Sequence, residues 1–232
     1  MKVAVINFSG NVGKTTVARH LLAPRIEGAE LITIESINAD DGQTQALRGR
    51  QFGELQEYLQ TVDNVVVDIG ASNVEELLSL MRKYRGSHED FDYFVIPTVP
   101  ALKQQQDTIA TLAELTRIGI PASKLKVVFN QVEDDTKVSE TFDTLLAFIE
   151  ENPPTQANTS CRLGANEIYE RVKGIGTNLA ELASDETDYK ALIAQARDTA
   201  EKLAWAQKLA TRRLASGVVP ELDASFGALD LR

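Results

Sequence analysis

The sequence predicts an α/β fold in which helices cover both faces of a mostly parallel β-sheet, followed by a helical C-terminal region. Short apolar runs rich in β-branched residues alternate with helical patterns along most of the chain. A glycine-containing loop joins the first run to the first helix, and polar residues follow the ends of several runs. Alternation of this kind favours a parallel sheet, because each crossover helix packs back onto the sheet.

The chain of 232 residues is long enough to bury a substantial core as one domain. Its formal net charge of −10 argues against a protein that coats DNA or an anionic membrane with its whole surface. Cys161 is the only cysteine, and His20 and His88 are far apart, so we expect neither disulfides nor a zinc site. The sequence shows no secretory signal and no apolar run of membrane-spanning length, so we expect a cytoplasmic protein.

The apolar runs predicted as strands are Lys2–Phe8, Ala29–Ile34, Asn64–Asp68, Asp92–Pro97 and Lys126–Asn130. Apolar residues at helical spacing predict the intervening helices, Thr16–Pro24, Gly53–Gln60, Val74–Tyr84, Gln104–Ile118 and Ser139–Glu150. Beyond a proline-containing break at 152–154, the pattern becomes mainly helical, over Glu167–Lys173 and Asp188–Leu214. We expect one domain over 1–214, with its helical C-terminal part from about residue 165. Glycine and proline interrupt the pattern over 215–232, which predicts a flexible tail.

The loop after the first strand reads Ser9-Gly10-Asn11-Val12-Gly13-Lys14-Thr15-Thr16. A strand, a glycine-containing loop and a helix that opens at Gly-Lys-Thr wrap backbone N–H groups around nucleotide phosphates. We expect Gly10 and Gly13 to let the loop turn without a Cβ clash, Lys14 to face the phosphates and Thr15 to ligate magnesium. Phe8 holds the position of the first glycine in the strict motif. A phosphate-binding loop is nevertheless favoured over a chance match in a surface turn.

Ligands of open parallel sheets bind beyond the carboxyl ends of the strands, where several polar residues of this chain are expected to meet. Asp68 closes an apolar strand, and a metal-holding carboxylate opposite Thr15 is favoured over one that caps the next segment. Asn130 closes another strand. Its amide offers a donor and an acceptor that suit the edge of a purine base, and a turn-forming asparagine is the alternative.

Together these motifs resemble the ParA/MinD superfamily of ATPases. The loop over 9–16 looks like the deviant Walker A loop, and Val65–Gly70 resembles the Walker B strand. Phe94–Thr98 and Val127–Gln131 resemble a later strand of that family and its adenine-recognising asparagine. The resemblance covers about residues 1–175 and is nearest to the plasmid-stability StbB type of ParA-like proteins. It implies a three-layer P-loop ATPase domain that binds ATP or ADP with Mg²⁺.

The resemblance also implies a homodimer that forms or tightens with ATP and acts in plasmid partition, plasmid stability or conjugative transfer through a plasmid-encoded DNA-binding adaptor. For hydrolysis it implies catalytic roles for Lys14 and Asp68, and an acidic residue after the second strand that orients the attacking water. Glu35, Asp40 and Asp41 are the candidates for that role. Serine stands at position 9, where the family has a signature lysine that reaches the phosphates of the partner subunit. Slow hydrolysis, or ATP binding with little turnover, is therefore an open alternative.

The helix predicted over Glu201–Leu214 carries basic residues beside apolar ones; the basic residues are Lys202, Lys208, Arg212 and Arg213. A packed helix with a solvated basic face is favoured, and contact with the DNA backbone or a membrane surface are the alternatives. The acidic tail weakens both alternatives, so direct DNA contact stays open and membrane contact is not expected. For the whole chain, a partition- or positioning-type ATPase is favoured over an ATP-sensing interaction module. A small-molecule P-loop kinase or ligase is the third candidate.

Overall fold

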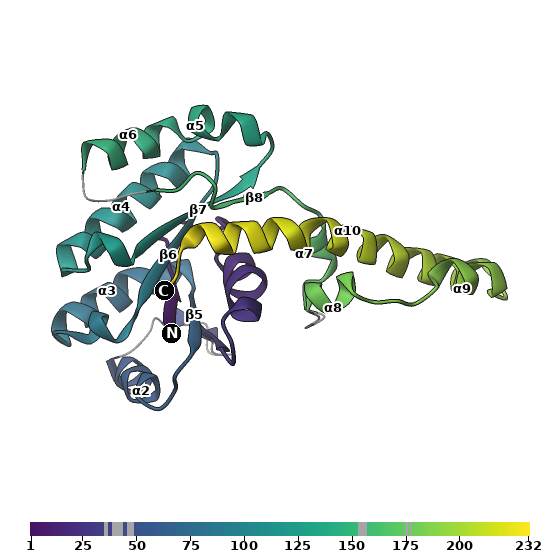
Figure 1. The fold of residues 1–232 in the computed structure, drawn as a ribbon. Helices are drawn as coiled ribbons and strands as arrows, with labels where there is room; N and C mark the ends of the chain where they lie inside the picture. Colours follow the sequence, from purple (N-terminus) through teal and green to yellow (C-terminus); the bar gives the residue numbers. More distant parts are fainter. Residues whose placement is uncertain (35–36, 39–43, 46–48, 153–156, 175, 177) are drawn as a thin grey trace.

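The computed structural model of the chain shows a six-stranded sheet between two layers of helices (Figure 1). It describes residues 1–34, 37–38, 44–45, 49–152, 157–174, 176 and 178–232. The strands of this sheet are β1 Lys2–Val5, β2 Glu30–Ile34, β5 Val65–Ile69, β6 Tyr93–Thr98, β7 Leu125–Val132 and β8 Arg162–Gly164. All of them pair in parallel, in the order β2-β5-β1-β6-β7-β8. The predicted three-layer α/β/α fold is confirmed.

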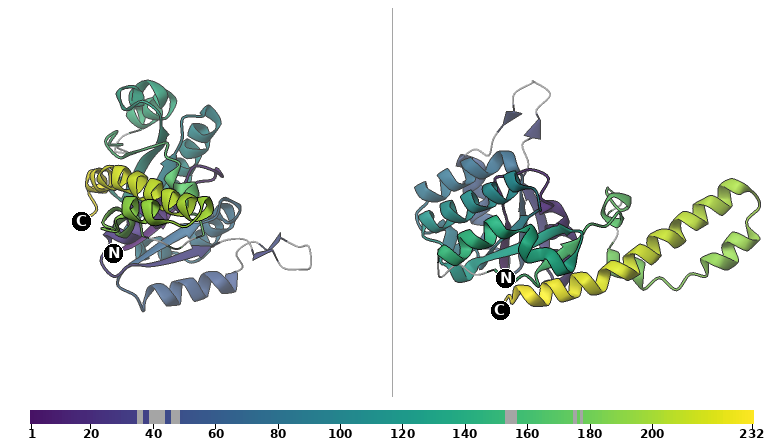
Figure 2. Two further views of the ribbon diagram at one scale, coloured as in Figure 1. Left: turned by 90° about the vertical axis from the view of Figure 1, so that its right-hand side faces the viewer. Right: turned by 90° about the horizontal axis from the view of Figure 1, so that it is seen from above.

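The helices connect and cover these strands. They are α1 Lys14–Thr16 with its π-helical continuation η1 Val17–Leu22, α2 Gly49–Leu59, α3 Val74–Lys83, α4 Leu102–Ile118, α5 Val138–Thr141, α6 Asp143–Glu151, α7 Ile168–Arg171, α8 Leu179–Ala183, α9 Tyr189–Gln195 and α10 Thr199–Leu229. A small hairpin, β3 Ile37–Asn38 and β4 Thr44–Gln45, projects from the body (Figure 2). Sequence patterns did not predict β8 or α8, because each is too short to display a period.

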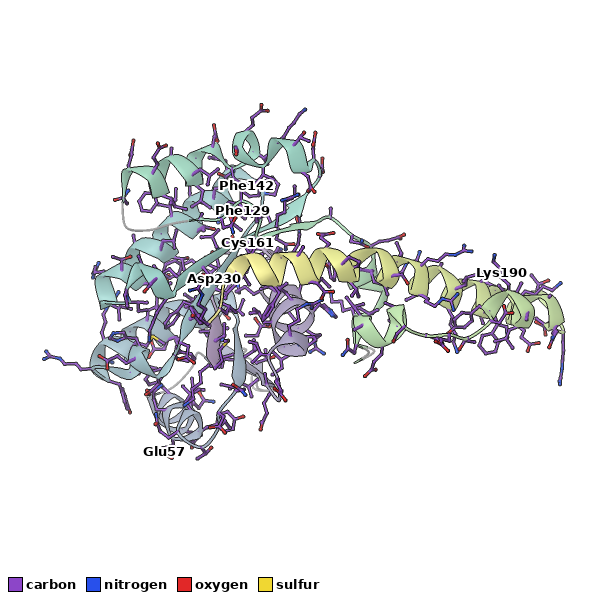
Figure 3. The ribbon with its side chains drawn as sticks, viewed as in Figure 1. Glu57, Phe129, Phe142, Cys161, Lys190 and Asp230 are labelled. Carbon is purple, nitrogen blue, oxygen red and sulfur yellow. The ribbon has the colours of Figure 1, made fainter. Side chains whose placement is uncertain are left out.

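The core has two halves because successive residues of a strand point to opposite faces of the sheet. Ala4, Phe94 and Phe129 lie on the face covered by α2 to α6. The ring of Phe129 meets that of Phe142 at 4.9 Å between centroids (Figure 3). Val3, Val66, Val95 and Val128 face the other way and pack against η1, α7 and α10. Both faces of the sheet are therefore dry, which accounts for strands that are apolar at nearly every position.

α10 contradicts the predicted tail, since residues 215–229 continue the helix that begins at Thr199. A proline in a helix interior costs about 3 kcal/mol and a glycine about 1 kcal/mol relative to alanine, and this stretch contains Pro220. However, the helix buries residues spaced three or four positions apart, namely Ala215, Val218, Leu222, Ser225 and Leu229. Burial of this stripe against the sheet outweighs the weak helix propensity. The expectation of a flexible tail is therefore wrong for residues 215–229.

The first part of α10 leaves the body and, together with α9, forms an arm over residues 189–214 that projects to one side (Figures 1 and 2). The rings of Tyr189 and Trp205 meet at 6.1 Å between centroids. The Arg212 guanidinium lies 5.1 Å from the centre of the Tyr189 ring and donates to the Asp185 carbonyl at 2.9 Å. Arg212 thus links α10 to α9 and to the residues just before it. None of the described helices is long and apolar enough to cross a bilayer.

Candidate functional site

The loop after β1 is anchored by Asn7, a fully buried polar residue that follows the strand. Its Nδ2 donates to the carbonyl of Pro97 at 2.9 Å and to Oγ1 of Thr108 at 2.8 Å. Its Oδ1 accepts from the backbone N–H of Ser9 at 2.8 Å. Asn7 therefore ties the beginning of the loop to the end of β6 and to α4. No sequence motif singles Asn7 out, although a polar residue at the end of the apolar run KVAVIN is the signal that could have done so.

Gly13 is required by the shape of the loop. Its φ is +85°, and a Cβ there would lie 2.0 Å from Nδ2 of Asn130. Asn130 is 3% exposed and donates this Nδ2 to the Val12 carbonyl at 2.9 Å. At Gly10, in contrast, φ is not left-handed, and a Cβ added there would have no neighbouring atom within 4 Å. The left-handed residue in the first half of the loop is Asn11, with φ of 58°, so the conformational reason expected for Gly10 does not hold.

Lys14 begins α1 and turns back across the loop. Its ammonium donates to the carbonyl of Ser9 at 2.6 Å and to that of Asn7 at 3.1 Å. Burial lowers the pKa of Lys14 to about 8, while the negative charge of Asp68 acts in the opposite direction. At pH 7 the amine therefore remains a buried cation at the mouth of the loop.

Thr15, in the first turn of α1, meets Asp68, near the end of β5. The hydroxyl of Thr15 donates to Oδ2 of Asp68 at 2.6 Å, and Asp68 is 3% exposed. Asp68 lies opposite Val5 in the parallel pairing of β1 with β5, which brings the end of β5 beside the loop. Thr16 follows on α1 and is half-buried.

The oxygen pair of Thr15 and Asp68 fits magnesium. Mg²⁺ prefers oxygen ligands and usually takes only one or two protein groups, its remaining ligands being water and phosphate. Within the described parts of the chain, there is no cluster of three or more His, Cys, Asp or Glu that could hold a metal by itself. A metal that is shared with a phosphate therefore suits this site better than a cage built from protein alone.

Ser9 is 4% exposed, and its hydroxyl hydrogen-bonds to Asp107 on α4. Asp107 also accepts from the ammonium of Lys103 at 2.8 Å. These bonds, that of Lys103 first, hold the pKa of the Asp107 carboxyl below its ordinary value. Sequence patterns do not point to this chain of contacts, because Lys103 and Asp107 are spaced like an ordinary helical surface pair.

The structure brings Lys14, Thr15, Asp68 and Asn130 together with the loop at the carboxyl ends of the strands, as predicted. β2 ends at Ile34, whose carbonyl accepts from the backbone N–H of Gly70 at 2.8 Å. The acidic candidates for orienting water, Glu35, Asp40 and Asp41, lie outside the described residues.

The sequence matches no family model and no curated protein. Solved structures do match it over most of their length. McdA of Cyanothece superposes with a TM-score of 0.53 at 14% identity, covering 90% of this chain and 98% of McdA. MinD of Aquifex aeolicus has a TM-score of 0.53 at 12% identity and covers 93% of this chain and 97% of MinD. A complex of MinC and MinD from the same organism has a TM-score of 0.54 at 11% identity, over 93% of this chain and 96% of that one.

A glycine-containing loop between β1 and α1, with a carboxylate of the adjacent strand on the loop threonine, defines the P-loop NTPase class of fold. Within that class, the match over nearly whole chains shows that this chain shares the particular fold of the McdA and MinD structures.

Proposed function

We propose that this chain is an ATPase of the ParA/MinD type that binds ATP with Mg²⁺ and works as a nucleotide-gated dimerisation switch. The observation that carries the proposal is the Thr15–Asp68 hydrogen bond of 2.6 Å beside the buried Lys14. A hydroxyl, a carboxylate and a cation at one edge of a phosphate loop are the groups that a metal-bound triphosphate requires.

Lys14 gives the physical reason to expect an anion. Its buried ammonium is hydrogen-bonded to two neutral carbonyls, those of Ser9 and Asn7. A buried cation gains more from a charged acceptor than from neutral ones, because charge-assisted hydrogen bonds are about twice as strong. A phosphate oxygen at this position would supply that charge and would raise the pKa of Lys14 from its depressed value.

In hydrolysis, Lys14 and the loop amides of residues 9–16 would offset charge on the phosphates, and Thr15 and Asp68 would hold the metal. Bound magnesium supplies electrostatic stabilisation of the developing charge. An acidic side chain, Glu35, Asp40 or Asp41, would orient a water for in-line attack on the γ-phosphate. ADP and phosphate are then the products, and the protein contributes positioning and electrostatics rather than a covalent bond. We assign Asn130 to the adenine base, with the Val12 carbonyl as its present partner.

As a switch, the chain would hold the loops after β2 and β5 in one arrangement with ATP and release them after hydrolysis. The proposed setting is the cytoplasm, in plasmid stability, partition or conjugative transfer. The chain would be of the StbB type and would have a plasmid-encoded DNA-binding adaptor as its partner. A second candidate is an ATP-sensing module with little turnover. The Ser9 hydroxyl favours it, since this residue is engaged by Asp107 and offers no cation to a partner subunit.

Light scattering tests the proposal, with the protein in Mg·ADP, Mg·ATP and a slowly hydrolysed ATP analogue. We expect a dimer with the triphosphates only, and its loss in Lys14→Ala. Lys83→Ala is the matched control, because Lys83 is an exposed lysine at the end of α3. A monomer that still binds nucleotide in every state would favour the sensor, and failure to bind nucleotide would overturn the proposal.

Phosphate release then separates the candidates for orienting water. We expect one of the variants Glu35→Gln, Asp40→Asn and Asp41→Asn to lose turnover while it retains the ATP-dependent dimer. A rapid, Lys14-dependent turnover that all three variants retain would remove these residues from the mechanism.

A further inference from the structure

A cavity of about 240 Å³ lies near the C-terminal end of η1, where this helix meets α8 and α10. Buried apolar side chains form part of its lining, namely Val172, Leu179 and Leu222. Polar residues complete it, among them Arg19, His20, Asn178 and Asp223. The phosphate loop lies at the opposite end of the same helix, so this cavity is separate from the nucleotide site.

We propose that this cavity binds a small organic monocarboxylate, held by the guanidinium of Arg19 and the imidazole of His20. The proposal does not depend on ATP binding, since no residue of the phosphate loop lines the cavity.

His20 provides the first argument. It is 8% exposed and lines the cavity, and neither ring nitrogen has a hydrogen-bond partner within the described parts of the chain. An imidazole that faces a cavity and has no protein partner can form a hydrogen bond with a ligand there. Burial, and then the charge of Arg19, lowers the pKa of His20 to about 4. The ring is therefore neutral at pH 7 and can donate one N–H to a carboxylate oxygen.

Two arginines line the cavity, Arg19 and Arg25, and they differ in what they contact. The Arg25 guanidinium is already used, because it pairs with Asp223 at 2.7 Å and donates to the His20 carbonyl at 2.7 Å. Arg19 is exposed and makes no ion pair with any other described residue. A free guanidinium at a cavity wall is suited to bidentate recognition of a carboxylate.

Charge and size define the class of ligand. The charges of Arg25 and Asp223 offset one another, which leaves the single positive charge of Arg19 in the lining. One negative charge complements it, whereas a phosphate dianion would leave excess charge beside Asp223. The apolar wall suits a hydrocarbon group. The cavity is smaller than the roughly 300–1,000 Å³ of pockets for drug-sized ligands, so the acid must be small.

Such a ligand would bridge two elements with different tasks. Arg19 and His20 belong to η1, which continues from the phosphate loop, and Leu222 belongs to α10, which leads into the arm. Binding would therefore connect the nucleotide-site helix with the projecting arm.

Titration with benzoate, followed by NMR of the histidine rings, tests the proposal. The chain contains only two histidines, so His88 serves as an internal control and His88→Gln assigns the signals. We expect benzoate to shift the His20 ring signals saturably and to leave those of His88 unchanged. Benzamide, a neutral molecule of the same shape, should shift neither set of signals.

Variants identify the recognising residues. Arg19→Gln should weaken benzoate binding at least tenfold, and Arg85→Gln, at another exposed arginine, should leave it unchanged. Ala180→Phe should block the cavity from its exposed rim without removing a charge. The proposal is overturned if benzoate causes no saturable shift of His20 or if Arg19→Gln binds like the parent chain. Tighter binding of inorganic phosphate than of benzoate would overturn the assignment to a monocarboxylate.

Discussion

Asn130 and Gly13 lie so close together that a Cβ on the glycine would meet Nδ2 of the asparagine at 2.0 Å. The same Nδ2 donates to the carbonyl of Val12 at 2.9 Å. Asn130 comes from β7, which is separated from β1 by β6 in the sheet. The shape of the phosphate loop is therefore held by a strand that is distant both in sequence and in sheet order.

Gly13→Ala should destabilise the protein. The left-handed backbone at φ +85° and the displacement of Asn130 together predict a loss of about 2–4 kcal/mol in the free energy of unfolding. Gly10→Ala is the control, because its Cβ would enter open space, and its effect should stay within about 0.5 kcal/mol. Urea denaturation measures both values. Equal effects of the two substitutions would contradict this structure of the loop.

Leu222→Ala should destabilise the protein by about 2–5 kcal/mol, because this side chain of α10 is fully buried. Leu203→Ala, in the same helix, removes a leucine that is 57% exposed and should cost less than about 0.5 kcal/mol. Thermal and urea unfolding compare the pair. If Leu222→Ala had as little effect as Leu203→Ala, residues 215–229 would not be part of the packed body.

Acidification should destabilise the fold through His20. Its pKa is about 4 in the folded chain and 6.5 ordinarily, so the unfolded chain binds its proton first as the pH falls. Above pH 6.5, His20 is neutral in both states and does not reduce the free energy of unfolding. As the pH falls from 6.5 toward 4, protonation of the unfolded chain at His20 lowers the free energy of unfolding by at most about 3 kcal/mol.

The pH dependence can be measured by urea unfolding in buffers free of carboxylates, which could themselves occupy the cavity. His20→Gln should flatten the curve between pH 6.5 and pH 4. His88→Gln should leave it as it is. A parallel course for the parent chain and His20→Gln would show that another group carries the dependence.

Lys103→Gln should raise the pKa of Asp107, because the hydrogen bond from Lys103 is the largest cause of its depression. The carboxyl ¹³C shift of Asp107 as a function of pH reports this directly. Lys137→Gln, which removes a lysine from a 3.9 Å pair with Asp134, should leave Asp107 unchanged. Stability should change by less than about 1 kcal/mol, because Lys103 is mostly exposed. A parent-chain Asp107 that titrates at 3.8 or above would contradict the observed contacts.

The sequence predicts well what depends on local pattern. The apolar runs around Val66 and Val128 become strands because both faces of the sheet are covered, so periodicity and β-branching agree with the final fold. Gly13, Lys14 and Thr15 are recognisable because a strand, a tight turn and a helix N-terminus follow one another along the chain. Asp68 is recognisable because it is a carboxylate at the end of an apolar strand.

Only the tertiary structure determines what depends on distant neighbours. Residues 215–229 have poor helix propensity and become helical because one stripe of α10 can be buried against the sheet. Asn7 and Asp107 acquire their roles from α4, which the fold places beside the loop although it lies about a hundred residues away from Asn7. In the sequence, His20 looks like an ordinary helical residue. It lines a cavity only because the fold places α8 and α10 beside η1. Burial and charge at these positions come from packing between segments, which a local pattern does not contain.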